Sequence, residues 1–197
     1  MNRQLCKTYG GVWPLVESLC NGHSSLMLTR PASDEFAPYY AGYIALVPDG
    51  DIRHQLRRQF LDTVALLSVV PDSKAEAGYE PGKWSLKEVV GHLCDAERVF
   101  AYRLLRIARG DETPLPGFEQ DDWIPTSRAN SRTMASLSLE FVAIRAATVQ
   151  LVDSLDDAAW VRRGTASGKM ISARALVYIC AGHEIHHLRI IRERYLA

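Results

Sequence analysis

The sequence predicts an all-α protein, a four-helix bundle with one long crossover connection. Two observations favour this class: four blocks of the chain carry apolar residues at helical spacing, and neither a pair of strands nor an internal repeat is evident. A third is size, because 197 residues of which 47% are hydrophobic suffice to bury one core. We expect one domain over residues 31–197. It follows a weakly structured N-terminal extension over residues 1–30, where apolar residues recur at neither helical nor strand spacing.

The first two helices have the clearest limits. The first is expected from about Asp51 until Pro71 stops it. Its apolar residues recur at helical spacing and are Ile52, Leu56, Phe60, Val64 and Leu67. The second begins at a capping box, in which the Ser85 and Glu88 side chains satisfy free backbone donors, and runs to about Arg109. His92 lies toward one edge of its apolar stripe, where it is expected to line the mouth of a cavity.

A long polar connection follows the second helix. It runs from Asp111 to Arg132, contains three prolines and Trp123, and exceeds the few residues that join adjacent antiparallel helices. We expect this segment to cross over the bundle and to cover part of a site.

Two further helices complete the predicted bundle. They are expected over roughly residues 136–155 and 172–195, joined by a segment that includes a loop at residues 164–168. Ahead of the bundle, the tyrosine-rich stretch from Phe36 to Pro48 fits either a short helix or a packed lead-in loop.

Composition excludes several classes of protein. The chain has 23 basic and 23 acidic side chains and no long basic run, so we expect no nucleic-acid partner. No apolar stretch approaches the ~20 residues of a membrane span, and the start lacks a signal-peptide core, so we expect no membrane partner. The four cysteines are scattered and form neither a CxxC pair nor the pattern of a disulfide framework. This spacing favours a protein of the reducing cytoplasm. They are Cys6, Cys20, Cys94 and Cys180.

Three of the six histidines lie within five consecutive positions of the last helix. At about 100° per residue, His183 and His187 fall within about 40° of each other, on the apolar stripe that faces the interior. Burying two imidazoles on an apolar face is costly unless a partner satisfies them, and a divalent metal does so. Glu184 and His186 lie at the two edges of this stripe. The residues alone thus predict a metal at His183 and His187.

Three passages resemble the DinB-like metalloenzyme superfamily over residues 36–197. They are Tyr79-Glu80-Pro81-Gly82-Lys83-Trp84-Ser85, Gly91-His92-Leu93-Cys94-Asp95-Ala96-Glu97-Arg98 and Gly182-His183-Glu184-Ile185-His186-His187-Leu188. The resemblance implies a four-helix bundle in which His92, His183 and His187 bind a divalent metal, most often zinc or nickel, with manganese and iron as the other options. Characterised members include transferases and isomerases that use the small thiols mycothiol or bacillithiol. The family name records induction by DNA damage and implies no DNA binding.

Three imidazoles leave a position open on the metal, which is typical of catalytic sites. Together with the resemblance, which implies the use of a small thiol, this favours a metal-dependent S-transferase that acts on a small-molecule substrate with a low-molecular-weight thiol. Asp95 and Glu184 are the candidates for proton transfer or for support of the ligands. Arginines on the second and fourth helices attract an anionic thiol or form a solvated face. They are Arg103, Arg106, Arg109, Arg189, Arg192 and Arg194.

Other functions remain open at this point. His183-Glu184-Ile185-His186-His187 satisfies the H-E-x-x-H signature of zinc peptidases, but only ten residues follow and none supplies their downstream ligand. A non-peptidase hydrolase with Glu184 as base is an alternative. Another is a non-catalytic helical stress protein, as a homodimer, in which Asp95 or Cys180 closes the metal site.

Overall fold

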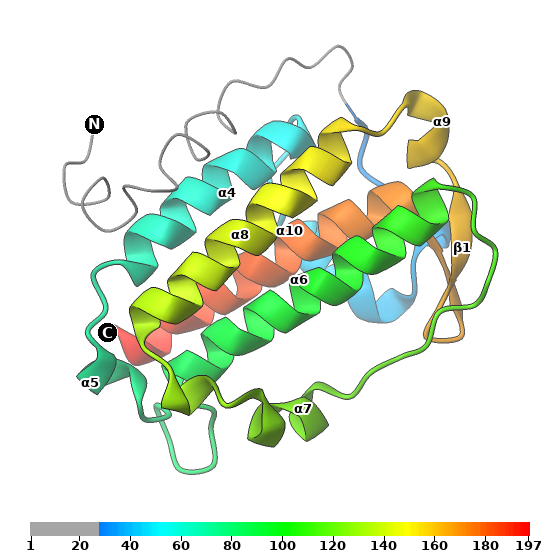
Figure 1. Ribbon diagram of the computed structural model, residues 1–197. Helices are drawn as coiled ribbons and strands as arrows, with labels where there is room; N and C mark the ends of the chain where they lie inside the picture. The colour runs from blue at the N-terminus through cyan, green and yellow to red at the C-terminus, as the bar shows by residue number, and fades with distance from the viewer. Residues whose placement is uncertain (1–27) are drawn as a thin grey trace.

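The computed structural model describes residues 28–197 and confirms the predicted four-helix bundle (Figure 1). The predicted N-terminal extension falls largely on residues 1–27, outside the described residues. The four long helices are α4 (Ile52–Leu67), α6 (Leu86–Ala108), α8 (Met134–Asp153) and α10 (Ala173–Ile190). A π-helical turn, η4 (Ile191–Tyr195), extends α10. Short helices occupy the connections: α5 (Asp72–Ala75), α7 (Gln120–Ser127), η3 (Ala129–Ser131) and α9 (Asp157–Trp160).

Side-chain caps start each long helix where the sequence turns helical. The Asp51, Thr133 and Ser172 side chains each accept a hydrogen bond from a free backbone N–H in the first turn of α4, α8 and α10. At α6 the predicted capping box forms, because Ser85 accepts from the Glu88 amide and the Glu88 carboxylate accepts from the Ser85 amide. These caps set the register from which the site residues follow.

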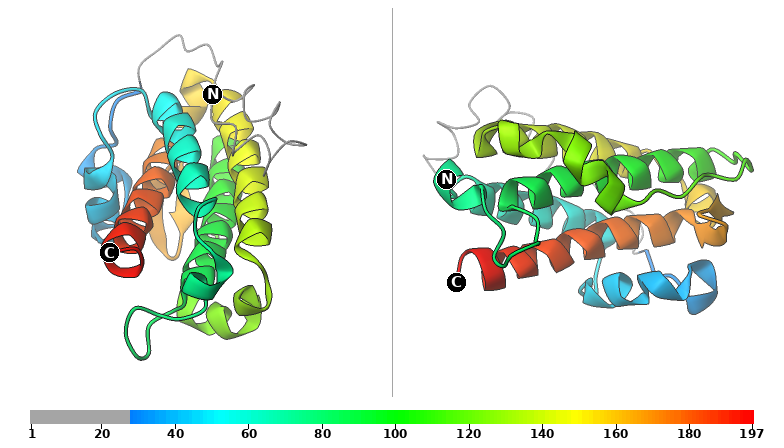
Figure 2. Two further views of the ribbon diagram at one scale, coloured as in Figure 1. Left: turned by 90° about the vertical axis from the view of Figure 1, so that its left-hand side faces the viewer. Right: turned by 90° about the horizontal axis from the view of Figure 1, so that it is seen from below.

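The order of the helices around the core differs from their order in the chain. α6 packs against α8 and α10, and α4 packs against the same two helices, so that α4 and α6 lie on a diagonal. α6 and α8 run in the same direction, and the long connection between them returns along the outside of the bundle (Figures 1 and 2). This topology places α6 directly beside α10, the two helices that carry the histidines.

The structure corrects one expectation, since a strand pair is present. β1 (Arg163–Ala166) and β2 (Lys169–Ser172) form an antiparallel hairpin. Its turn uses positive φ at Ser167 and Gly168, as two-residue hairpin turns require. Strands of four residues are too short to produce a clear alternating pattern, which explains the miss. Leu115 of the crossover pairs with β1, through Leu115 N–H to Thr165 O and Ser167 N–H to Leu115 O, and so ties the crossover to the hairpin.

The aromatic stretch before the bundle is helical and packs on α10. It contains η1 (Ser33–Glu35), η2 (Pro38–Tyr40) and α3 (Ala41–Leu46). A Cβ on Gly182 would lie 2.0 Å from the Tyr43 carbonyl oxygen, so only glycine permits this approach. Residues 28–30, which we expected in the extension, also contact the domain: the Tyr178 hydroxyl donates to Leu28 O and Arg30 donates to Val47 O.

α8 is long and apolar enough to cross a membrane, contrary to the expectation that no such stretch exists. In the structure half of its apolar window is buried, and the helix packs against α4 and α6. It also carries the fully buried Arg145. These are properties of a central bundle helix.

Candidate metal centre

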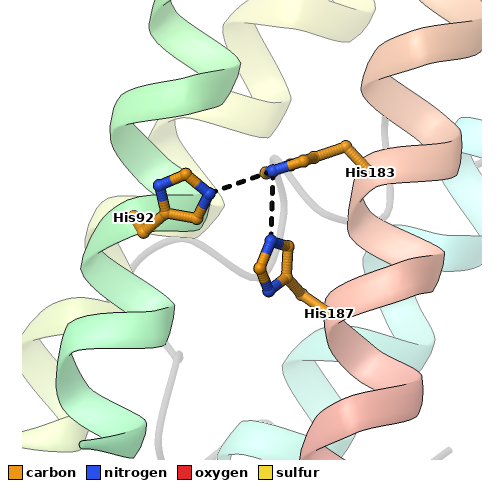
Figure 3. A group of neighbouring side chains, drawn as sticks. All are labelled: His92, His183 and His187. Carbon is orange, nitrogen blue, oxygen red and sulfur yellow. Dashed lines mark hydrogen bonds between the residues drawn. The ribbon is translucent and has the colours of Figure 1, made fainter. Parts of the chain in front are cut away.

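Three histidines from two helices converge on one point. His92 projects from α6, and His183 and His187 project from successive turns of α10 toward it (Figure 3). The Nε2 atom of His183 lies 3.0 Å from Nε2 of His92 and 3.2 Å from Nε2 of His187. One ring nitrogen of each histidine lies within 4.8 Å of the others. The residues that the sequence predicted as ligands therefore form one cluster.

Burial keeps these imidazoles neutral. It lowers the pKa of His92 to about 4, although the negative charge of Asp121 partly opposes the shift. Burial and the neighbouring imidazoles lower the pKa of His187 to about 3 and that of His183 well below its ordinary value. At neutral pH each ring therefore keeps one nitrogen without a proton, and this nitrogen is free to bind a metal.

The donor set fits a divalent metal. Three Nε2 atoms that face one another cannot all be satisfied by hydrogen bonds, since a neutral ring nitrogen is either a donor or an acceptor. Tetrahedral bonds of about 2.05 Å to zinc would separate two nitrogens by about 3.3 Å, close to the two spacings between these atoms. Imidazole ligands suit zinc, nickel and iron alike.

Aromatic rings hold the histidines in place. The Trp84 ring lies 5.1 Å from the His92 ring, and the Tyr43 ring makes edge contacts with His183 at 5.5 Å and with His186 at 5.4 Å. His186 itself is only partly buried and packs beside Tyr43 rather than joining the cluster. The Trp84 and Tyr43 contacts restrict the ring orientations on which ligand geometry depends.

The two carboxylates that we proposed as acid–base groups lie elsewhere. Glu184 is buried, accepts a 2.5 Å hydrogen bond from the Thr63 hydroxyl and forms a 2.7 Å ion pair with Arg145. Burial raises its pKa, which Arg145 and Thr63 oppose. Asp95 pairs with Arg98 at 3.3 Å and lines a cavity that none of the three clustered histidines reaches. Both are committed to other contacts, and neither belongs to the histidine cluster.

Two cavities border the cluster, one lined by His92 and His183 and the other by His187. The first, which we call the aromatic cavity, has a volume of about 430 Å³ and extends from His92 and His183 toward the hairpin. Its ring-bearing lining residues are Tyr39, Tyr40, Tyr43, Phe100 and Phe118. The second, the C-terminal cavity, has a volume of about 290 Å³ and extends from His187 toward Tyr195. Volumes of this size suit small molecules.

The C-terminal cavity reveals a residue that sequence reasoning missed. Asp121, in the first turn of α7, lines this cavity, as His187 does, and acts electrostatically on His92. It lies on the crossover, which we expected to cover part of a site. The sequence signal was therefore the unusual length of the connection, without any indication of which of its side chains reaches the histidines.

Other candidates are accounted for by local contacts. Cys180 is buried, with its thiol pKa raised by burial, and is a core residue. Neither cavity is lined by any of the six arginines that we considered as anion attractors. Arg106 pairs with Asp111 and Arg189 with Glu193, while Arg103 donates to Pro116 O. The interpretation as a solvated face therefore fits Arg106 and Arg189 but is wrong for Arg103, which is buried.

The sequence profile of the DinB superfamily matches residues 55–191, more than half of the chain, and this range includes all three clustered histidines. The chain belongs to the DinB superfamily. Among curated members it is 29% identical over 125 residues to the "Putative metal-dependent hydrolase OB0413" of Oceanobacillus iheyensis. That match spans 61% of this chain and 70% of the relative.

Two solved structures share the fold. YfiT from Bacillus subtilis, described as a probable metal-dependent hydrolase with an unusual four-helix bundle topology, superposes with a TM-score of 0.60 at 17% identity. The match covers 89% of this chain and 95% of YfiT. A mycothiol-dependent maleylpyruvate isomerase superposes with a TM-score of 0.59 at 15% identity, over 70% of this chain and 58% of the isomerase. At these identities the likeness establishes the fold alone.

Proposed function

We propose that this DinB protein is a metal-dependent enzyme that joins a small thiol to a small-molecule substrate. The observation that carries the proposal is a pair of cavities, each of which is lined by part of the histidine cluster. A two-substrate transfer needs two binding spaces that share one reactive point, whereas hydrolysis needs space for one substrate and a water. The described metal-ligating group consists of three histidines, and neither Asp95 nor Cys180 closes it, which supports a catalytic rather than a structural site.

His92, His183 and His187 would hold the metal, with zinc and nickel as the proposed ions. When bound, the metal supplies a positive charge that lowers the pKa of a coordinated thiol or water. We assign the substrate to the aromatic cavity, whose rings suit a flat or apolar body. The smaller C-terminal cavity, which contains Lys83 and Asp121, would receive the thiol, with Asp121 positioned to accept its proton. The free Cys94 and Cys180 support a reducing cytoplasmic location.

An S-transfer assay tests this proposal. Protein reconstituted with zinc or nickel is mixed with a panel of thiols (cysteine, glutathione, bacillithiol and mycothiol) and the electrophile 1-chloro-2,4-dinitrobenzene, and thioether formation is followed by absorbance. We expect metal-dependent turnover that His187→Ala abolishes. The matched control is His54→Ala, because His54 is exposed and lies outside the cluster. Turnover equal in both variants, or in metal-free protein, would refute the proposal.

A hydrolase is the second candidate, and the position of Asp121 favours it. A carboxylate that lines the same cavity as His187 is available to accept a proton from water, a role that Glu184 cannot fill while it pairs with Arg145. Hydrolysis of p-nitrophenyl esters without added thiol distinguishes the two reactions. In this case Asp121→Asn should lower kcat by about 100-fold, within the range for loss of a general base, while metal content stays unchanged.

A further inference from the structure

A buried ionic network joins the four long helices at the level of the metal centre. Arg145 of α8 binds the Glu97 carboxylate of α6 through Nε at 2.7 Å and through Nη2 at 2.8 Å. Its Nη1 binds the Glu184 carboxylate of α10 at 2.7 Å. Thr63 of α4 donates to the other oxygen of Glu184 at 2.5 Å. Each helix of the bundle thus contributes one side chain.

This network is costly to bury. Arg145 is 0% exposed, Glu184 1% and Glu97 3%. Ion pairs in such surroundings contribute little net stability compared with apolar residues of the same size, because each charge loses its hydration. What they supply instead is geometry, since a guanidinium binds two carboxylates only in fixed directions. The network is therefore better explained by placement of the helices than by stability.

The helices that Arg145 bridges are the two that carry the metal-binding histidines. Glu184 directly follows His183 on α10, and Glu97 lies five residues after His92 on α6. The contact among Glu97, Arg145 and Glu184 therefore fixes the separation of α6 and α10 close to the histidines.

We propose that Glu97, Arg145 and Glu184 form a clamp that holds α6 and α10 at the separation needed for metal binding. These three are positioning residues that touch neither metal nor substrate. The inference rests on the proposed function only in requiring a metal at the histidines, and it holds for transfer and hydrolysis alike.

Arg145→Lys tests the clamp, because lysine keeps the charge but cannot bridge two carboxylates. The matched control is Arg57→Lys. Arg57 is also largely buried and pairs with Asp153, but this pair joins α4 to α8, which carry no metal-binding histidine. The dissociation constant for zinc is measured by competition with a chromophoric chelator, and the absorption spectrum of the cobalt-loaded protein reports ligand geometry. Melting temperatures are recorded for each variant.

We expect Arg145→Lys to weaken zinc binding by about 10-fold or more, the range for residues that support metal ligands, and to change the cobalt spectrum. Arg57→Lys should lower the melting temperature but leave both metal readouts as in the wild type. If Arg145→Lys does not fold, Thr63→Val removes a single hydrogen bond to Glu184 and should weaken zinc binding in the same direction, by a smaller factor.

If Arg145→Lys folds, a zinc affinity equal to that of Arg57→Lys would overturn the clamp. If Arg145→Lys does not fold, a zinc affinity of Thr63→Val equal to that of the wild type would overturn it. Either result leaves the proposed function intact. A wild-type protein that binds no divalent metal would overturn both. A wild type that binds metal but shows neither transfer nor hydrolysis would overturn the proposed function alone, because the affinity comparison requires no turnover.

Discussion

Gly182→Ala is expected to push α3 away from α10 and thereby loosen the metal centre. The added Cβ would lie 2.0 Å from the Tyr43 carbonyl oxygen and 2.4 Å from its carbonyl carbon, and real Cβ atoms essentially never approach other atoms within 3.0 Å. Because the obstacle is backbone rather than a flexible side chain, α3 must move by roughly 1 Å. Tyr43 would then lose its edge contacts with His183 and His186.

The magnitude follows from two opposing effects. Overpacking of this kind costs about 1–3 kcal/mol, whereas alanine gains about 1 kcal/mol over glycine inside a helix. The net loss is therefore about 0–2 kcal/mol, which lowers the melting temperature of a chain of this size by up to about 8 °C. Thermal denaturation followed by circular dichroism measures the shift, and the zinc affinity should fall with it.

Gly42→Ala provides the control, since Gly42 lies in α3 itself and a Cβ there would meet nothing within 4 Å. This substitution should raise the stability by about 0.5–1 kcal/mol. If Gly182→Ala raises the melting temperature as Gly42→Ala does, the close contact between α3 and α10 does not exist in solution and the reasoning fails.

Three further predictions concern the metal, acid sensitivity and a helix cap. Zinc or nickel at 100 times its dissociation constant should raise the free energy of unfolding by about 2.7 kcal/mol, and His187→Ala should remove this increase. A wild-type melting temperature that the metal leaves unchanged would contradict the site. Although burial opposes the shift, the Arg174 ion pair and the Ala32 amide lower the pKa of Glu35 to about 2. Glu35 therefore stabilises the fold above its ordinary pKa of 4.5 and loses that contribution, at most about 3 kcal/mol, as the pH falls toward 2. In urea titrations the stability difference between the wild type and Glu35→Gln should shrink from about pH 6 to about pH 3, and a constant difference would rule out this linkage. Ser85→Ala removes the cap of α6 and should cost about 1 kcal/mol without loss of metal, so a variant that loses metal instead would assign Ser85 to the site.

The elements that depend on local contacts were predictable from the sequence. Helix caps and apolar spacing involve residues at most four positions apart, so Ser85 and Pro71 located the ends of helices before any packing was known. The pairing of His183 with His187 belongs to the same class, because residues i and i+4 share one face of any helix. The hairpin at residues 163–172 was not predicted, because its strands are too short to show a clear alternating pattern.

Tertiary structure decided which groups the histidines meet. His92 entered the predicted site through a family resemblance, and its distance from His183 depends on α6 and α10 being neighbours across 91 positions of the chain. Helical spacing placed Glu184 at the edge of the histidine stripe. Its role, at the metal centre or in an ion pair, depended on the position of Arg145, which lies 39 residues earlier in the chain.

The same limit explains Asp121 and the two cavities, which exist only once the crossover lies along the bundle. The four long helices, the cap of α6 and the pair of imidazoles on α10 follow from the sequence, because those features arise from neighbours within about one turn. The approach of His92 to that pair, the buried clamp and the space around the histidines depend on the packing of whole helices, because they are contacts between distant segments of the chain.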